Sequence, residues 1–302
     1  MTPQDDHPDD TSLSAIVGER RHLLDVAFRL LGSSAESELA VDRCYAHWHR
    51  LTASERAAIP EPRVWLTREV SRLALDLLDS ADTRRSQYPG EWLPEPVPHA
   101  SAPSARIDVE DRITLDDSLN MLLMVTLESL APAERVAFIL HDVFGVSYDV
   151  IADVVGRSPD ASRSLARHAR QRIRSSRRDE LPADRHDEIV LALLRACESG
   201  DEDAVAGLLN PDVTVLTDGG GKVRVPVEPV HGSRRSARLL VRLLATAPDM
   251  VATPQSVNGH AGLVFRRDDS VIGVLSLDAR GDTVHDIWIV LNPEKLRRWN
   301  TP

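Results

Sequence analysis

The sequence predicts a chain of three folded parts, two all-helical domains followed by a domain that combines helices with a sheet. Up to about residue 180, apolar residues recur at the spacing of one buried helical face. After residue 210, short β-rich segments bounded by Gly and Pro replace that pattern. A chain of 302 residues, 42% of them hydrophobic, is long enough to bury a core in each part.

Composition excludes several classes of protein. The net charge of -11 argues against general coating of nucleic acid, so any such contact must be local. Cys44 and Cys197 have no Cys-x-x-Cys spacing and no nearby His pair, so we expect two buried thiols and neither a disulfide scaffold nor a metal site. The N-terminus is acidic and no apolar run has the length of a membrane span. We therefore expect a cytoplasmic protein without a membrane segment, a metal or a cofactor.

The first helical domain is expected over residues 12–86, after a disordered acidic tail at 1–11. One helix runs from Ser14 to Gly32, a natural C-cap, and a second spans residues 35–50. A polar loop over 52–62 precedes a third helix. Its apolar stripe is Leu66, Val70, Leu73 and Leu77.

A linker follows at residues 87–112. Prolines recur from Tyr88 to Pro98, so this stretch cannot be helical and is extended by steric preference. Trp92 and Leu93 between these prolines predict a semi-rigid strap with an apolar anchor that docks in a groove. The alternative is an exposed spacer.

The second helical domain, residues 113–180, carries a helix-turn-helix pattern. Helical periodicity resumes at Leu115 and leads into an apolar stripe between Glu134 and Phe144. A short helix at 148–155 ends at Gly156, and Ser158 before Pro159 is a good N-cap for a third helix.

That third helix has a basic face. Four arginines fall within roughly 60° of one another at 100° per residue, and they are Arg163, Arg167, Arg170 and Arg174. Ala161, Leu165, Ala169 and Ile173 lie on the far side. Guanidinium groups on a major-groove helix contact phosphates or guanine edges, so this face is predicted to bind DNA. The alternative is an ordinary solvated surface.

The C-terminal domain is expected over residues 183–298 as an α+β cone with a curved antiparallel sheet. Helices are predicted at 184–198, 204–209 and 234–247, and strands at 213–216, 223–230, 263–266, 271–277 and 284–290. Asp218-Gly219-Gly220-Gly221 provides a tight reversal between the first two strands. It is not a phosphate-binding loop, because Lys222 is followed by Val223 where that motif needs Ser or Thr.

Motifs in all three parts resemble one bacterial family. Arg29–Ser33 and Pro62–Thr67 lie in the first domain, and Leu130–Phe138 and Tyr148–Ala152 lie in the second. More specific are Trp92–Pro96, Asp218–Val223, Val257–Gly259 and Asn292–Leu296. Together they resemble extracytoplasmic-function sigma factors, in particular the group with a fused SnoaL-like C-terminal domain.

The resemblance implies a promoter-specificity subunit that binds the β and β′ subunits of core RNA polymerase and promoter DNA. Residues 12–86 would be sigma region 2, residues 113–180 sigma region 4, and residues 183–298 the regulatory domain. The implied polymerase contacts are Leu39, Asp42, Tyr45 and Trp48, and Ser158 joins the four arginines in contacting DNA. The residues implied in interdomain control are Trp92, Leu93, Pro94, Asp218, Gly219, Gly220, Gly221, Lys222, Asn292 and Pro293.

Two departures from the family pattern keep other hypotheses open. Leu39 stands where the family has an acidic residue, and Asp79 and Asp82 stand where the family has the arginine-rich end of its minus-10 helix. A degenerate DNA-binding regulator that no longer recruits polymerase is one alternative, and a small-molecule sensor is another. An enzyme is a third, with a general base among His231, His260, Asp278, His285 and Asp286. Our main prediction has no catalytic residue and a monomer when free.

Overall fold

A computed structural model describes residues 18–80, 88–98, 120–176, 181–245 and 249–300. The chain packs as two compact units. The first joins Met1–Ala81 to Leu130–Arg170, and the second joins Asp82–Ser129 to Gln171–Pro302. The described part of the linker, residues 88–98, therefore packs with the C-terminal domain. The expected acidic tail lies outside the described residues.

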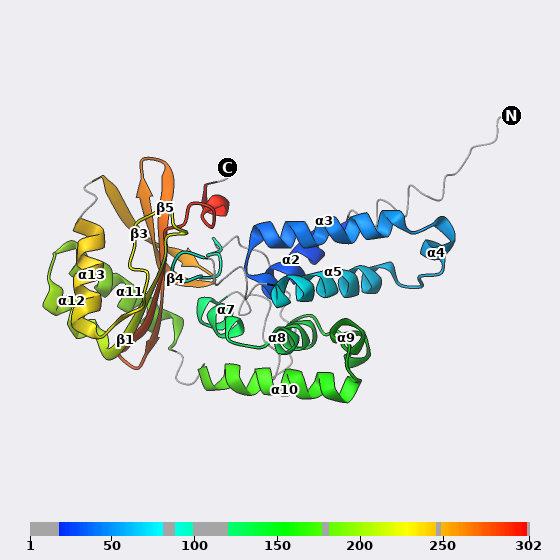
Figure 1. Cartoon of the computed structure of the whole chain (residues 1–302). Coiled ribbons are helices and arrows are strands. Elements are labelled where there is room, and N and C mark those ends of the chain that lie inside the picture. The colour runs from blue at the N-terminus through cyan, green and yellow to red at the C-terminus, as the bar shows by residue number, and fades with distance from the viewer. Residues whose placement is uncertain (1–17, 81–87, 99–119, 177–180, 246–248, 301–302) are drawn as a thin grey trace. The chain divides into compact units, whose positions relative to one another are not determined.

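The N-terminal part of the first unit is helical, as predicted (Figure 1). Gly32 ends the first helix in the left-handed conformation, and Ser33 caps the second by accepting from the Glu36 amide. A short helix occupies part of the expected polar loop, because Thr52 and Glu55 form a capping box. The elements are α2 (Arg20–Leu31), α3 (Ser34–Arg50), α4 (Ala53–Ala57) and α5 (Pro62–Asp79).

The rest of the first unit is the helix-turn-helix. Helix α8 (Pro132–Phe138) continues as a π-helical turn, η2 (Ile139–Val143), so the expected helix forms with a widened end. Helix α9 (Tyr148–Val155) ends at Gly156 in the left-handed conformation, and α10 (Pro159–Ser176) follows. Arg135 on α8 donates to the Leu30 carbonyl at 2.9 Å, which joins these helices to α2.

The second unit is built on a six-stranded sheet in the order β2-β1-β6-β5-β4-β3. Neighbouring strands are antiparallel except β1 and β6, which are parallel. The strands are β1 (Leu209–Asp218), β2 (Val230–His231), β3 (Met250–Val257), β4 (His260–Arg267), β5 (Ser270–Arg280) and β6 (Thr283–Val290). The helices are α7 (Met121–Glu128), α11 (Ala183–Glu198), α12 (Glu202–Leu208), α13 (Ser233–Ala245) and the 3-10 turn η3 (Arg297–Trp299).

Both faces of this sheet are covered. Helices α11, α12 and α13 lie on one face, where Ile287 and Ile289 of β6 join their apolar core (Figure 1). Trp288 and Val290 alternate with them along the strand and face a second cluster that includes Leu93 of the linker. The linker, helix α7 and C-terminal residues therefore cover that side of the sheet.

Three sheet predictions were wrong. Residues 223–229 are not a strand, because Pro226 and Pro229 lack the amide hydrogen that pairing needs. Strand β3 was missed, and Pro254 fits within it because β3 is an edge strand. The sheet is mixed, not antiparallel throughout. Ala245 ends helix α13, and the rest of its predicted end, residues 246–247, lies outside the described residues.

Cys44 and Cys197 are buried and free, as expected. Burial raises the pKa of each thiol to about 12, which disfavours the reactive thiolate. None of the helices in the described ranges combines the length and apolarity needed to cross a bilayer.

Candidate functional site

Helix α10 is positioned by local interactions that the sequence predicted. The Ser158 hydroxyl accepts from the Ala161 amide at 3.2 Å, and Pro159 occupies the first turn. Ala166, Ala169 and Ile173 are buried together with Ser162. The buried stripe is thus rotated slightly from the predicted one, since Ala161 and Leu165 are only partly buried.

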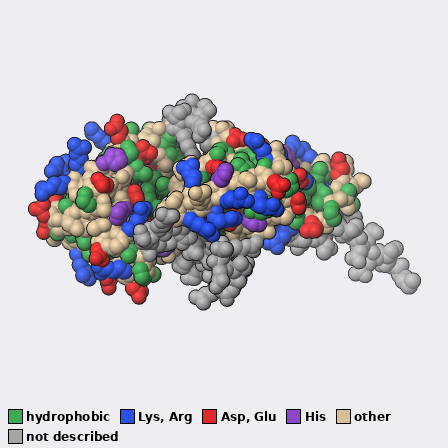
Figure 2. Space-filling view, turned by 90° about the horizontal axis from the view of Figure 1, so that it is seen from below, with side chains coloured by type: hydrophobic (Ala, Val, Ile, Leu, Met, Phe, Trp, Pro, Cys, Tyr) green, Lys and Arg blue, Asp and Glu red, His purple; other side chains and the backbone are tan. Residues whose placement is uncertain are grey.

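Three of the four predicted arginines lie on the exposed side of α10, namely Arg163, Arg167 and Arg174. Figure 2 shows Lys and Arg side chains gathered over this helix. Arg163 forms an exposed ion pair with Asp160 at 2.9 Å and lies 5.2 Å from the Tyr148 ring centroid. Such an exposed pair is weak, so a phosphate can replace Asp160 at little cost.

Arg170 has a different environment. Its guanidinium donates two hydrogen bonds to the Asp142 carboxylate, at 2.8 and 2.9 Å, and Asp142 is only 4% exposed. A bidentate pair with a buried carboxylate links η2 to α10. The structure therefore gives Arg170 a stabilising contact where the sequence suggested a DNA-facing side chain.

The residues expected to contact polymerase also fall into exposed and buried side chains. Leu39 is 41% exposed, Asp42 forms an exposed ion pair with Arg20 at 3.0 Å, and Tyr45 is partly buried. Trp48 is 1% exposed and packs edge-to-face on Trp65, with ring centroids 5.2 Å apart. Trp48 is a core residue, so a surface contact is not open to it.

The predicted strap, residues 88–98, meets a buried charge in the second unit. The fully buried Asp218 accepts hydrogen bonds through Oδ1 from the Tyr88 hydroxyl at 2.5 Å and the Gly220 amide at 3.0 Å. Its Oδ2 accepts from the Leu93 amide at 3.0 Å and the Lys295 ammonium at 2.7 Å. Because Tyr88 and Leu93 belong to the strap, one carboxylate ties the strap to β1. Four donors compensate the burial of its charge.

Lys295 is the charged partner of Asp218, and these two residues together are called the latch pair. Its ammonium also donates to the Leu93 carbonyl and lies 3.9 Å from the Trp92 ring centroid and 5.1 Å from that of Tyr88. Burial lowers the pKa of Lys295, and the charge of Asp218 opposes that effect. The strap thus surrounds a cation with two aromatic rings and a carbonyl.

The glycine turn brings these groups close together. Gly220 and Gly221 have φ values of 60° and 70°, which L side chains rarely adopt. A Cβ on Gly220 would lie 2.4 Å from the Asn292 side chain, and one on Gly221 would lie 2.6 Å from Cγ of Pro89. The Asn292 amide in turn donates to the Tyr88 hydroxyl at 2.9 Å. The absence of side chains in the turn therefore permits the strap to dock.

Apolar and backbone contacts hold the rest of the strap. Leu93 is 2% exposed within the second apolar cluster, and Pro94 is buried beside it. Asn258, at a φ of 54°, exchanges two hydrogen bonds with the Val97 backbone, at 2.9 and 3.0 Å. The Trp299 indole donates to the Pro96 carbonyl at 2.8 Å.

The structure brings together most residues predicted for interdomain control. Gly219 lies in the turn and Pro293 lines a cavity behind it. The Lys222 ammonium forms an exposed ion pair with Glu294 at 2.6 Å. The site residues that sequence reasoning missed are Tyr88, Asn258, Lys295 and Trp299. The first three stand in segments already singled out, whereas nothing in the sequence pointed to Trp299.

The five residues considered for catalysis do not all gather in one pocket, and the two that do, His260 and Asp278, line a cavity of only about 20 Å³. His231 contacts Thr214, His260 contacts Asn120 at 2.8 Å, and His285 contacts Asn210. Asp278 and Asp286 flank Arg280, and burial raises the pKa of Asp286. None of these five lines the cavity described below. Among the described residues, no group of three or more His, Cys, Asp or Glu side chains could hold a metal ion.

Comparisons with known proteins agree with this architecture. Residues 120–173 match the family described as Sigma-70, region 4. The chain is 37% identical over 293 residues to the ECF RNA polymerase sigma factor SigJ of Mycobacterium tuberculosis, covering 91% of this chain and 90% of that one. It is 32% identical over 280 residues to the probable ECF RNA polymerase sigma factor SigI of the same species, covering 92% of each. The crystal structure of M. tuberculosis SigJ aligns with a TM-score of 0.67 and 32% identity, over 95% of this chain and 98% of that one.

Proposed function

Because this chain belongs to the extracytoplasmic-function (ECF) RNA polymerase sigma factors, we propose that its C-terminal domain controls promoter use by holding the strap between the two sigma regions. The chain directs RNA polymerase to promoters and carries a fused SnoaL-like domain. The buried latch pair is the observation that supports this control. Asp218 and Lys295 lie 77 residues apart, yet both bind strap residues.

Holding the strap restricts the connection between the two sigma regions. The strap follows α5, and only residues 129–131 separate α7 from α8. Both the strap and α7 pack on the sheet of the second unit. When the strap is released, regions 2 and 4 are left joined by their direct contacts, such as the hydrogen bond from Arg135 to the Leu30 carbonyl. Once those contacts also open, regions 2 and 4 could reach separate sites on polymerase and promoter.

We assign promoter contact to the exposed face of α10. Arg163, Arg167 and Arg174, with the Ser158 hydroxyl at the helix start, suit phosphate and guanine contacts in a major groove. Arg167→Ala should weaken promoter binding by about 1 to 3 kcal/mol, or lower the salt slope by about one. Arg195→Ala, which removes an exposed arginine from α11, is the matched control. Equal binding of both variants would contradict the assignment.

We assign the polymerase contact to the exposed residues of α3. Leu39, Asp42 and Tyr45 remain candidates for the β′ subunit, and region 4 is the candidate for the β subunit. This activity belongs in the cytoplasm, where RNA polymerase acts, and the free chain is proposed to be a monomer.

Transcription in vitro with core polymerase tests the control mechanism. Asp218→Asn and Trp92→Ala should each release the strap and raise promoter output several-fold, with core binding in a pull-down unchanged. Asp282→Asn is the control, because Asp282 forms an exposed ion pair with Arg185 and contacts no strap residue. Wild-type output and wild-type protease resistance of the strap in both variants would refute the proposal.

A further inference from the structure

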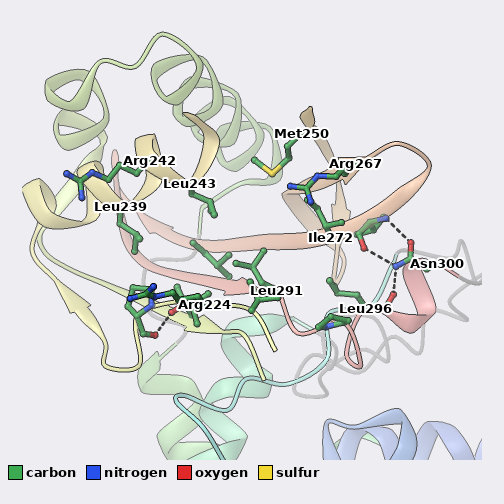
Figure 3. A pocket seen from close by; sticks show the side chains of 17 residues that line it. Arg224, Leu239, Arg242, Leu243, Met250, Arg267, Ile272, Leu291, Leu296 and Asn300 are labelled. Atoms are coloured by element: carbon green, nitrogen blue, oxygen red, sulfur yellow. Dashed lines mark hydrogen bonds between the residues drawn. The ribbon is translucent and has the colours of Figure 1, made fainter. Parts of the chain in front are cut away.

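A cavity of about 550 Å³ lies in the second unit, between α13 and the sheet face that α13 covers (Figure 3). Its walls are mostly apolar and include Leu239, Leu243, Met250, Ile272 and Ile289. The volume falls within the range of about 300 to 1,000 Å³ of small-molecule sites. The transcription mechanism above makes no use of this cavity.

Arginines from three separate elements line the same cavity. Arg224 follows the glycine turn, Arg242 lies on α13, and Arg267 ends β4. All three side chains are exposed, so they stand at the rim of the cavity, and Figure 3 shows Arg242 extending away from the apolar side chains. No Asp or Glu of the described ranges is among its lining residues. Three guanidinium groups at the rim of an apolar cavity favour a ligand with an anionic group and an apolar body.

The cavity walls are also the segments that hold the strap. Thr217 lines the cavity, while the next residue, Asp218, binds the strap. Leu291 lines the cavity, while the Asn292 amide binds Tyr88. The same relation holds for Leu296 and its neighbour Lys295. Thr217–Asp218 and Leu291–Asn292 are extended, so successive side chains point to opposite sides, whereas Lys295 and Leu296 lie in a turn. Cavity and strap therefore share one wall of the second unit.

We propose that this cavity binds an amphipathic carboxylate, a molecule with one anionic head and an apolar body, and that its occupancy stabilises the docked strap. The proposal of ligand binding depends on the cavity alone, whereas the proposed effect on the strap rests on the proposed function. The cavity is formed by Leu291, Leu296 and Thr217 in the positions that they hold when the strap is docked. A ligand that needs this wall binds the docked state more tightly and shifts the equilibrium toward it.

Calorimetric titration of the full chain with octanoate tests the site, with octanol as the uncharged probe. Octanoate should bind at least about tenfold more tightly than octanol, because only the carboxylate can form an ion pair with bidentate hydrogen bonds to an arginine. The triple variant Arg224→Gln/Arg242→Gln/Arg267→Gln should lose that preference. Arg238→Gln, on the same helix but outside the cavity, should keep it. Equal affinity for acid and alcohol, or unchanged binding by the triple variant with native circular dichroism, would overturn the proposal.

Titration of Asp218→Asn separates the two proposals. If octanoate binding and strap docking are coupled, octanoate must bind Asp218→Asn at least about fivefold more weakly than the wild type. It must also protect the strap of the wild type from protease. Octanoate binding without any change in Asp218→Asn would refute the coupling and leave the site intact. Higher transcription by Asp218→Asn without octanoate binding to the wild type would refute the site and leave the proposed function intact.

Discussion

Substitution of Asp218 and Lys295, the latch pair, tests most directly how the strap is held. In the folded chain, Asp218 is 0% and Lys295 7% exposed at the side chain, with Nζ and Oδ2 2.7 Å apart. Removing one partner of a buried ion pair leaves the other charge uncompensated and costs about 3 to 5 kcal/mol. A double-mutant cycle measures the coupling directly.

The two single variants should differ in severity. In Lys295→Met, the Asp218 carboxylate keeps donors from Tyr88, Leu93 and Gly220, so a cost near the lower value of about 3 kcal/mol is expected. In Asp218→Asn, the ammonium keeps the Leu93 carbonyl but loses its counter-charge, which favours the upper value of about 5 kcal/mol. The double variant removes the stranded charge. With a coupling of about 3 kcal/mol, it should lose only about 5 kcal/mol in total.

Urea unfolding followed by tryptophan fluorescence measures these free energies. Trp48 and Trp65 are replaced by Phe in every variant, so that the remaining tryptophans, Trp92, Trp288 and Trp299, report on the second unit. Additive losses, with a coupling below about 0.5 kcal/mol, would show that the pair does not act as a unit and would refute the reasoning.

Three further predictions concern single side chains. Burial, together with the neighbouring Asp218 carboxylate, raises the pKa of the Tyr88 phenol. The protonated phenol therefore contributes its full stability below about pH 10, and this contribution is lost as the pH rises further. Tyr88→Phe should reduce the alkaline fall in the unfolding free energy measured in urea. Arg170→Ala removes the bidentate partner of the buried Asp142 carboxylate and should cost about 3 to 5 kcal/mol in thermal unfolding of the helix-turn-helix. Arg170→Lys should recover only part of this loss, because lysine cannot form the bidentate pair. Gly220→Ala should expose the strap to protease, because its Cβ would lie 2.4 Å from a neighbouring side chain, whereas Gly200→Ala has a similar φ but open space and should leave the strap protected.

Local features of the fold were predictable. Gly32 and Gly156 end helices in the left-handed conformation, and Ser158 caps α10, because each depends on a few consecutive residues. The strand predicted over 223–230 failed for a reason also present in the sequence. Its two prolines outweigh the β-branched residues around them.

The fate of individual charged and aromatic side chains was not predictable. Helical periodicity aligns Arg170 with the exposed arginines of α10, but Arg170 instead forms an ion pair with Asp142, 28 residues earlier in the chain. Trp48 falls on a helix expected to face polymerase, yet Trp65 packs against it in the core. Such partners are distant in the chain, so no local pattern identifies them.

The sequence by itself determined the order of two helical parts and an α+β part, the caps of the main helices, and the motifs shared with ECF sigma factors. The tertiary structure decided that the strap packs with the C-terminal domain, that Asp218 and Lys295 hold it, and that the same wall encloses an arginine-lined cavity. The physical reason is burial. A carboxylate becomes the centre of a site only when folding removes it from water and brings Tyr88, Leu93 and Lys295 to it.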